Sequence, residues 1–119
     1  MPREKETSQG TFRRGIIPMA VLLLLNYREM YGYEIVQELK RLTGGALDIH
    51  EGSLYPVLYR LQEAGCVSDE KRQVGKRLTR VYYSITPKGK EYMKELLADY
   101  NAVHAGVLSL MEFGGVDDE

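Results

Sequence analysis

Residues suited to binding a phosphate backbone gather in two places in this chain of 119 residues. Tyr55, Tyr59 and Arg60 share the outer side of one predicted helix, where they offer hydrogen-bond donors and apolar surface. Lys76 and Arg77 fall in a predicted turn between two strands, where long cationic side chains can reach a phosphate. Cations beside donors that can reach base edges are typical of proteins that bind nucleic acid. The two groups therefore predict a nucleic-acid ligand.

Catalytic and metal-binding patterns do not stand out in the same way. The sequence contains no glycine-rich phosphate loop, no nucleophile motif and no obvious pair of acid and base. His50 precedes a predicted helix, where a solvated loop histidine is favoured over a phosphate contact, and His104 is expected to pack beside an apolar stripe. No close spacing of ligand residues suggests a metal site. We therefore predict that the protein is not an enzyme and has no cofactor and no metal.

Cys66 is the only cysteine, so neither a disulfide within the chain nor a cysteine-based zinc cluster can form. It lies at the start of a predicted strand, where a buried thiol usually behaves as a small hydrophobic side chain. Redox sensing is the less favoured alternative, because no lysine, arginine or histidine immediately flanks Cys66 to favour a thiolate. A single thiol fits a reducing compartment, and we expect a cytoplasmic protein.

Composition places the chain among single globular domains, with 44% hydrophobic and 28% charged residues. The net charge is only -1, but the signs are segregated, because basic residues cluster over 72–90 and acidic residues dominate 112–119. The apolar run at 16–25 contains Pro18 and is too short to span a bilayer. We expect a local basic face and no membrane partner.

Hydrophobic periodicity predicts the elements that would position these side chains. Helices are expected at residues 15–26, 31–42, 53 to about 64, and 87–113, and strands at 66–71 and 81–85 around a basic loop at 72–79. Ser53 is expected to cap the third helix, with Pro56 in its first turn, and Thr86 is expected to cap the last helix. In the second strand, Val81, Tyr83 and Ile85 should share one face.

This order of elements predicts a mostly α fold with a small β-hairpin, namely a winged helix-turn-helix followed by a long C-terminal dimerisation helix. We divide the chain into a flexible N-terminal arm (1–12), the winged helix-turn-helix domain (13–86), the dimerisation helix (87–113) and an acidic disordered tail (114–119). The third helix would be the one that enters the major groove of DNA, and the hairpin would be the wing.

The last helix carries an apolar stripe that is longer than one small core can cover. A partner helix from a second copy is the simplest way to bury it, so we expect a homodimer. The residues predicted to form the dimer interface are Met93, Leu96, Leu97, Tyr100, Val103, Val107, Leu110 and Met111.

Several segments of this sequence resemble the PadR family of bacterial regulators. They are Gly32-Tyr33-Glu34-Ile35, Glu51-Gly52-Ser53-Leu54-Tyr55-Pro56-Val57-Leu58, Arg60-Leu61, Gly65, Arg80-Val81-Tyr82-Tyr83-Ser84-Ile85-Thr86 and Gly89. The resemblance covers about residues 16–89, and residues 52–58 are its most specific part, because a proline inside a recognition helix after Leu-Tyr is unusual. The chain length is similar to that of the subgroup with one short C-terminal helix.

The resemblance implies a winged-helix repressor that binds a pseudo-palindromic operator in double-stranded DNA as a homodimer. It also implies release by a small aromatic or cationic effector bound near the dimer interface. Some drug-sensing members stack ligands on a tryptophan of the last helix, but this chain has none, and Tyr100 or Phe113 would have to replace it. Taken with the residue patterns, the predicted DNA contacts are Tyr33, Ser53, Tyr55, Tyr59, Arg60, Lys76, Arg77 and Arg80.

A different class of function stays open at this point. Exposed tyrosines on a helix are often packing residues, and a basic hairpin is often only a solvated turn. The chain could then be a protein-interaction module that keeps the winged fold without binding nucleic acid. Such a module should have a neutral wing and an apolar or acidic recognition helix, and the basic wing argues against it.

Overall fold

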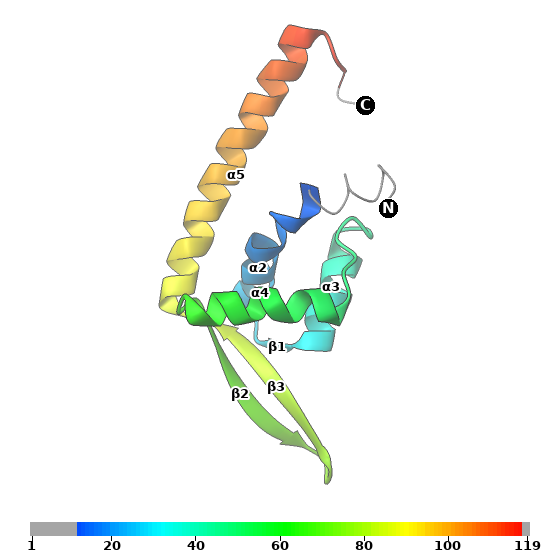
Figure 1. Cartoon of the computed structure of the whole chain (residues 1–119), viewed down its shortest axis with the longest axis vertical. Helices are drawn as coiled ribbons and strands as arrows, with labels where there is room; N and C mark the ends of the chain where they lie inside the picture. Colours follow the sequence, from blue (N-terminus) through cyan, green and yellow to red (C-terminus); the bar gives the residue numbers. More distant parts are fainter. Residues whose placement is uncertain (1–11, 118–119) are drawn as a thin grey trace.

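A computed structural model describes residues 12–117 of the chain. The elements are α2 (Ile17–Tyr27), β1 (Met30–Tyr31), α3 (Gly32–Leu42), α4 (Glu51–Glu63), β2 (Val67–Val74), β3 (Leu78–Ile85) and α5 (Pro87–Gly114). Figure 1 shows α4 crossing the front of a small helical body, with the hairpin of β2 and β3 projecting to one side and α5 to the other. The mostly α fold with a winged helix-turn-helix and a long last helix is thus confirmed.

The core lies where α2, α3 and α4 meet the base of the sheet. Its largest fully buried side chains are Leu22, Met30, Ile35, Leu54, Leu58 and Val21. Burying each of them stabilises the fold by about 1.5–3 kcal/mol relative to leaving it exposed. Most residues of α2 are buried, as its sequence, apolar on nearly every side, predicts. This packed body fixes the positions from which α4 and the wing project.

The start of α4 differs from the prediction. The helix begins at Glu51 after His50 as the N-cap, so Ser53 lies inside the first turn and does not cap it. Pro56 consequently lies in the helix interior rather than in the first turn. Because proline has no N–H, the carbonyl of Gly52 lacks its usual helical donor at this point. The prediction was wrong here because Glu51 and Gly52 are already helical, so the helix begins earlier than expected.

The sheet is antiparallel with the strand order β1-β3-β2, and its first strand was not predicted. Met30 and Tyr31 pair with Tyr83 and Tyr82 of β3, so the connection before α3 becomes an edge strand. The hairpin strands are longer than expected, since pairing runs from Val67 with Ile85 out to Val74 with Leu78. The predicted basic loop therefore shrinks to residues 75–77, and Gly75 adopts the positive φ of 76° that the tight turn requires.

The joint between the wing and α5 is closely packed. The Thr86 hydroxyl accepts a hydrogen bond from the N–H of Gly89 at 3.0 Å, which confirms the predicted cap. A Cβ atom on Gly89 would lie 2.1 Å from the carbonyl oxygen of Cys66, so only glycine fits at this position. Cys66 itself is buried, with 2% of its surface exposed, as predicted. The joint therefore holds the base of α5 tightly against the start of β2.

The predicted arm lies almost wholly outside the described residues, because only Phe12 of it is described. The predicted tail begins with the last residue of α5, Gly114, and only its final two residues lie outside the described range. Among the described residues, no helix combines the length and the apolar character that crossing a membrane would need.

Candidate nucleic-acid interface

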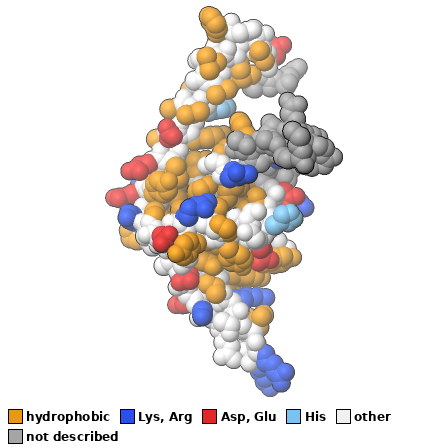
Figure 2. All heavy atoms as spheres, in the orientation of Figure 1, with side chains coloured by type: hydrophobic (Ala, Val, Ile, Leu, Met, Phe, Trp, Pro, Cys, Tyr) orange, Lys and Arg blue, Asp and Glu red, His pale blue; other side chains and the backbone are white. Residues whose placement is uncertain are grey.

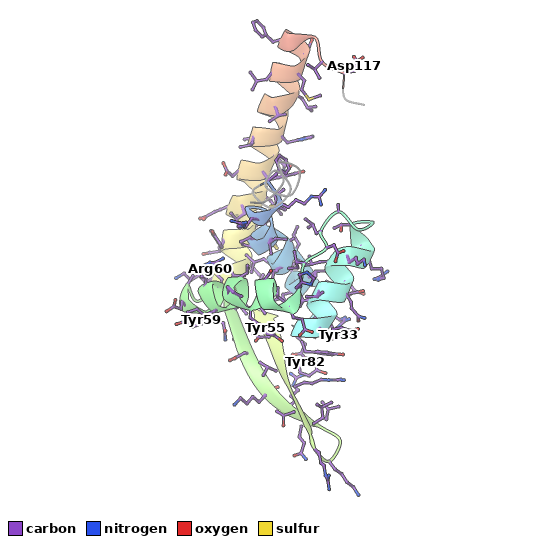
Figure 3. The ribbon with its side chains drawn as sticks, turned by 45° about the vertical axis from the view of Figure 1, so that its right-hand side comes forward. Tyr33, Tyr55, Tyr59, Arg60, Tyr82 and Asp117 are labelled. Carbon is purple, nitrogen blue, oxygen red and sulfur yellow. The ribbon has the colours of Figure 1, made fainter. Side chains whose placement is uncertain are left out.

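The outer side of the helix-turn-helix presents tyrosines. In Figure 3, Tyr55 and Tyr59 lie on the side of α4 nearer to the wing, and Tyr33 lies close by on α3. Tyr33 is 50% exposed and Tyr59 is 60% exposed, so most of each ring is open to a ligand. Buried Leu54, Leu58 and their neighbours anchor the opposite side of α4 in the core. Exposed predicted contact residues therefore lie on both helices of the helix-turn-helix, on the side nearer to the wing.

Tyr55 has a packing role that the sequence pattern did not reveal. Its hydroxyl donates a hydrogen bond to Oε2 of Glu51 at 3.1 Å, and its ring lies over Gly32 of α3. A Cβ atom on Gly32 would approach the Tyr55 hydroxyl oxygen to 2.5 Å, so the two helices meet where no side chain fits. Partial burial, followed by the hydrogen bond to Glu51, raises the pKa of Tyr55 above its usual value. Only part of this ring is left to contact a ligand.

Arg60 lies apart from the tyrosines. It lines a groove of about 460 Å³ between α4 and α5, together with Lys88, Glu91 and Tyr92. Figure 3 likewise places Arg60 on the side of α4 that faces away from the wing. Ser53 lies seven residues earlier, which is close to two full helical turns, so it shares this side of α4. The structure therefore separates Ser53 and Arg60 from Tyr55 and Tyr59.

The tip of the wing carries a concentrated positive charge. Lys76 and Arg77 are exposed in the turn after Gly75, and Figure 2 shows basic side chains at the far end of the hairpin. Among residues 12–117, no carboxylate lies within ion-pairing distance of either cation. These charges are therefore available to a phosphate, and the hairpin carries them well away from the core.

Two further arginines face each other across the hairpin. Arg72 and Arg80 are direct cross-strand partners, a pairing that like charges would normally destabilise. The charge of Arg72 is compensated by Glu29, whose carboxylate accepts hydrogen bonds from both terminal nitrogens of Arg72 at 2.6 and 2.7 Å. Arg80 lies over the ring of Tyr31, with its guanidinium carbon 4.3 Å from the ring centre. The predicted contact Arg80 is thus half-buried on β3, two positions from the tip end of the strand, whereas Lys76 and Arg77 are exposed in the turn itself.

The ion pair with Arg72 changes the pKa of Glu29. The hydrogen bonds from Arg72 lower the pKa of this carboxyl below its usual value, against an opposing effect of desolvation. Sequence reasoning missed Glu29, because a residue pair 43 positions apart leaves no periodic signal in one sequence.

The fold and the motif residues can be compared with known proteins. Residues 21–95 match the model of the transcriptional regulator PadR-like family. This chain belongs to the PadR-like family. The family consists of transcriptional regulators and not of enzymes.

Individual relatives are similar over most of this chain. The transcriptional regulator Rv3488 of Mycobacterium tuberculosis is 33% identical over 84 residues, which are 71% of this chain and 75% of that protein. The crystal structure of a PadR family regulator from Eggerthella lenta superposes with a TM-score of 0.77 at 31% identity, over 90% of this chain and 91% of that chain.

A third relative was crystallised with DNA. The structure of Bacillus subtilis PadR in complex with operator DNA superposes with a TM-score of 0.65 at 27% identity, over 69% of this chain. The match spans 46% of that longer chain. The PadR-like family, to which this chain belongs, therefore includes a regulator that binds operator DNA.

The α5 residues that are predicted to form the dimer interface of this PadR-like chain fall into two groups. Met93 is buried in the core of its own chain, and Leu96 and Leu97 pack partly against the same core. Tyr100, Val103, Val107 and Leu110 are exposed, and Met111 is partly exposed. Met93 therefore has almost no surface left for a partner, whereas the far half of the stripe is open.

A second groove borders the open stripe. It has a volume of about 400 Å³ and is lined by apolar residues of the N-terminal segment and by Asp99, Tyr100 and His104 of α5. The rings of Tyr100 and His104 stack with their centres 6.0 Å apart. Within the described residues, no group of three or more potential metal ligands comes together.

Proposed function

We propose that the protein is a sequence-specific repressor that acts in the cytoplasm and binds a pseudo-palindromic operator as a homodimer. The observation that carries this proposal is the combination of exposed Tyr33 and Tyr59 on the helix-turn-helix with the open cations Lys76 and Arg77 at the wing tip. The tyrosines are suited to base edges and sugars, and the cations to phosphates. The proposed DNA contacts are therefore led by these four residues.

The remaining predicted contacts have weaker support. Tyr55 is only partly exposed, Arg80 is held over the Tyr31 ring, and Ser53 and Arg60 lie on the other flank of α4. A duplex that covers the N-terminal half of α4 would still bring Ser53 close to a phosphate. The expected order of importance is thus the wing tip and Tyr59 first, and Arg60 last.

Dimerisation is supported by the open half of the α5 stripe. Val103, Val107 and Leu110 expose apolar surface along one side of α5. A second copy that pairs through this half, with help from the N-terminal helix α2, would bury it. Two recognition helices related by a two-fold axis would then enter major grooves about 34 Å apart.

Repression and release by an effector come from different observations. The Bacillus subtilis relative, 25% identical over 88 residues, is called a negative transcriptional regulator, which supports repression here. The groove beside Tyr100 and His104 offers aromatic rings and the carboxylate of Asp99, which suit a small aromatic or cationic effector. An effector there would act by favouring one spacing of the two recognition helices over another.

The testing experiment measures binding by fluorescence anisotropy over a series of salt concentrations. One labelled duplex carries the DNA upstream of the protein's own gene, and a second carries a random sequence of equal length. We expect tight, salt-sensitive binding to the upstream duplex and weaker binding to the random one. Failure to bind either duplex at low salt would contradict the proposal.

A further inference from the structure

Glu29 lies in the connection between α2 and β1, outside every predicted contact. Its two carboxylate oxygens accept hydrogen bonds from both terminal nitrogens of Arg72, at 2.6 and 2.7 Å. The Ser84 hydroxyl adds a third, longer hydrogen bond to the same carboxylate at 3.4 Å. A two-pronged arginine–carboxylate pair fixes direction as well as distance. The connection and the wing are therefore joined in one defined geometry.

This ion pair spans the whole sheet. β1 pairs only with the central strand β3, and Arg72 projects from β2 on the far side of it. Because Met30 pairs with Tyr83, Glu29 stands level with Ser84 of β3. Its carboxylate therefore reaches across the central strand to the outer strand of the wing. No backbone pairing joins β2 directly to β1.

Aromatic rings continue the connection on the same face of the sheet. The Arg72 guanidinium lies 4.6 Å from the centre of the Tyr82 ring, and Tyr82 meets Tyr31 edge to face at 5.6 Å. Arg80 closes the series over the other ring, so the two cross-strand arginines are held apart by two tyrosines. Each cation gains from its ring, and their mutual repulsion is reduced.

The inner end of this series is anchored to the helix-turn-helix. The N–H of Tyr31 donates to Glu34 at 3.2 Å, and Arg28 forms an ion pair with Glu34 at 3.3 Å. Gly32, the first residue of α3, lies against the ring of Tyr55 on α4. The wing is thus linked to the recognition helix through the start of α3.

We propose that Glu29 is a positioning residue for DNA recognition, which sets the angle of the wing relative to α4 by holding Arg72 across the sheet. This inference rests on the proposed function, in which α4 and the wing tip contact one duplex. A carboxylate near DNA ordinarily weakens binding through repulsion. A geometric role therefore predicts the opposite sign from a purely electrostatic one when the charge is removed.

Glu70 provides a matched control. Its carboxylate also accepts a hydrogen bond from Arg72, but it lies on the same strand, two positions away. Glu29→Gln and Glu70→Gln therefore remove the same charge from the same arginine. Only the first substitution breaks a link between the wing and the rest of the molecule.

The experiment compares full-length wild type, Glu29→Gln and Glu70→Gln in two measurements. Amide hydrogen exchange in the free protein reports the order of β2 and β3, and anisotropy reports the ratio of affinities for the upstream and random duplexes. We expect Glu29→Gln to lose protection along the hairpin and to lower the affinity ratio by up to about fivefold, the upper end of the range for exposed ion pairs. Glu70→Gln should keep the wild-type exchange pattern and bind both duplexes slightly more tightly.

Equal behaviour of the two variants in both measurements would overturn the inference, and so would a Glu29→Gln variant that loses protection but keeps the wild-type affinity ratio. Failure of the proposed function looks different, because wild type itself would then bind neither duplex.

Discussion

The wing and the far half of α5 differ in whether their side chains find partners within the same chain. In the outer half of the wing, Arg72 and Arg80 have partners within the same chain, a carboxylate for one and an aromatic ring for the other. In the far half of α5, Val103 and Leu110 remain 59% and 69% exposed. Polar groups can be satisfied singly, whereas an apolar stripe needs an extended surface to cover it. The two wing arginines thus have partners within one chain, whereas the apolar side chains in the far half of α5 stay exposed.

Charged substitutions in the exposed half of the α5 stripe should have the largest effect. Val107→Glu combined with Leu110→Glu should weaken self-association more than about 100-fold, because pairing would bury carboxylates without partners. Sedimentation velocity over a range of protein concentrations measures the change. Operator affinity should fall with it, since the two half-sites would no longer be linked.

Asn101→Glu combined with Ala105→Glu is the control for that pair. Both residues are exposed and lie on the opposite side of α5, so the same charges should leave self-association intact. Dimers of wild-type strength in the Val107 and Leu110 variant would mean that the chains pair through another surface.

The next largest effect is expected at the joint between the two ends. Gly89→Ala would force a methyl group against the Cys66 carbonyl, where a Cβ atom has only 2.1 Å. The free energy of unfolding should fall by about 1–3 kcal/mol, the usual cost of overpacking, as measured by urea denaturation. Gly106→Ala, on the same helix with nothing within 4 Å, should instead stabilise the protein by up to about 1 kcal/mol. Unchanged stability in Gly89→Ala would show that the joint can relax.

Removing the wing-tip charges should change DNA binding without changing the fold. Lys76→Ala combined with Arg77→Ala should weaken binding to all duplexes by about tenfold and flatten the salt dependence by about two phosphate contacts. Anisotropy titrations at several salt concentrations measure both quantities. Lys90→Ala combined with Lys94→Ala removes two cations from α5 instead, and the slope should then stay at its wild-type value. A wild-type slope in the wing variant would place the wing away from DNA.

The smallest effect concerns the pH dependence of the ion pair between Glu29 and Arg72. Because the pKa of Glu29 is lowered in the folded protein, its contribution to stability is present above its ordinary pKa of 4.5 and is lost as the pH falls through the lower folded value. The stability difference between wild type and Glu29→Gln should therefore be constant near neutral pH and shrink below about pH 4.5. Urea denaturation between pH 7 and pH 3 measures it, and a difference that stays constant to pH 3 would contradict the assigned cause.

The features that follow from local physics could be predicted from the sequence. The apolar spacing of α3 and α5, the cap at Thr86 and the glycine in the wing turn each depend on residues within one or two turns of chain. The motif residues on α4 and β3 added the family, which the match over residues 21–95 confirms. These features therefore need no knowledge of tertiary contacts.

The features that were missed depend on distant partners. Tyr55 looks like an exposed contact until Gly32, on another helix, is known to lie beneath it. Met30 and Tyr31 are too short a segment to show the alternation of a strand, and their pairing comes from β3. Met93 continues the α5 stripe in sequence, yet the core of its own chain covers it. In each case the local pattern was correct and the tertiary neighbour decided the role.

Because Gly89 packs tightly against the Cys66 carbonyl, α5 and the winged domain would rotate together as one rigid body. The helix has 28 residues, so it is about 42 Å long. A tilt of about 5° at its base would displace its far end by about 4 Å over that length. The same relation works in reverse, so a small change in how two far ends meet becomes a rotation of the winged body. The spacing of the two recognition helices, and so of the half-sites that they can bind, would then be set at the end of α5 that lies farthest from the DNA.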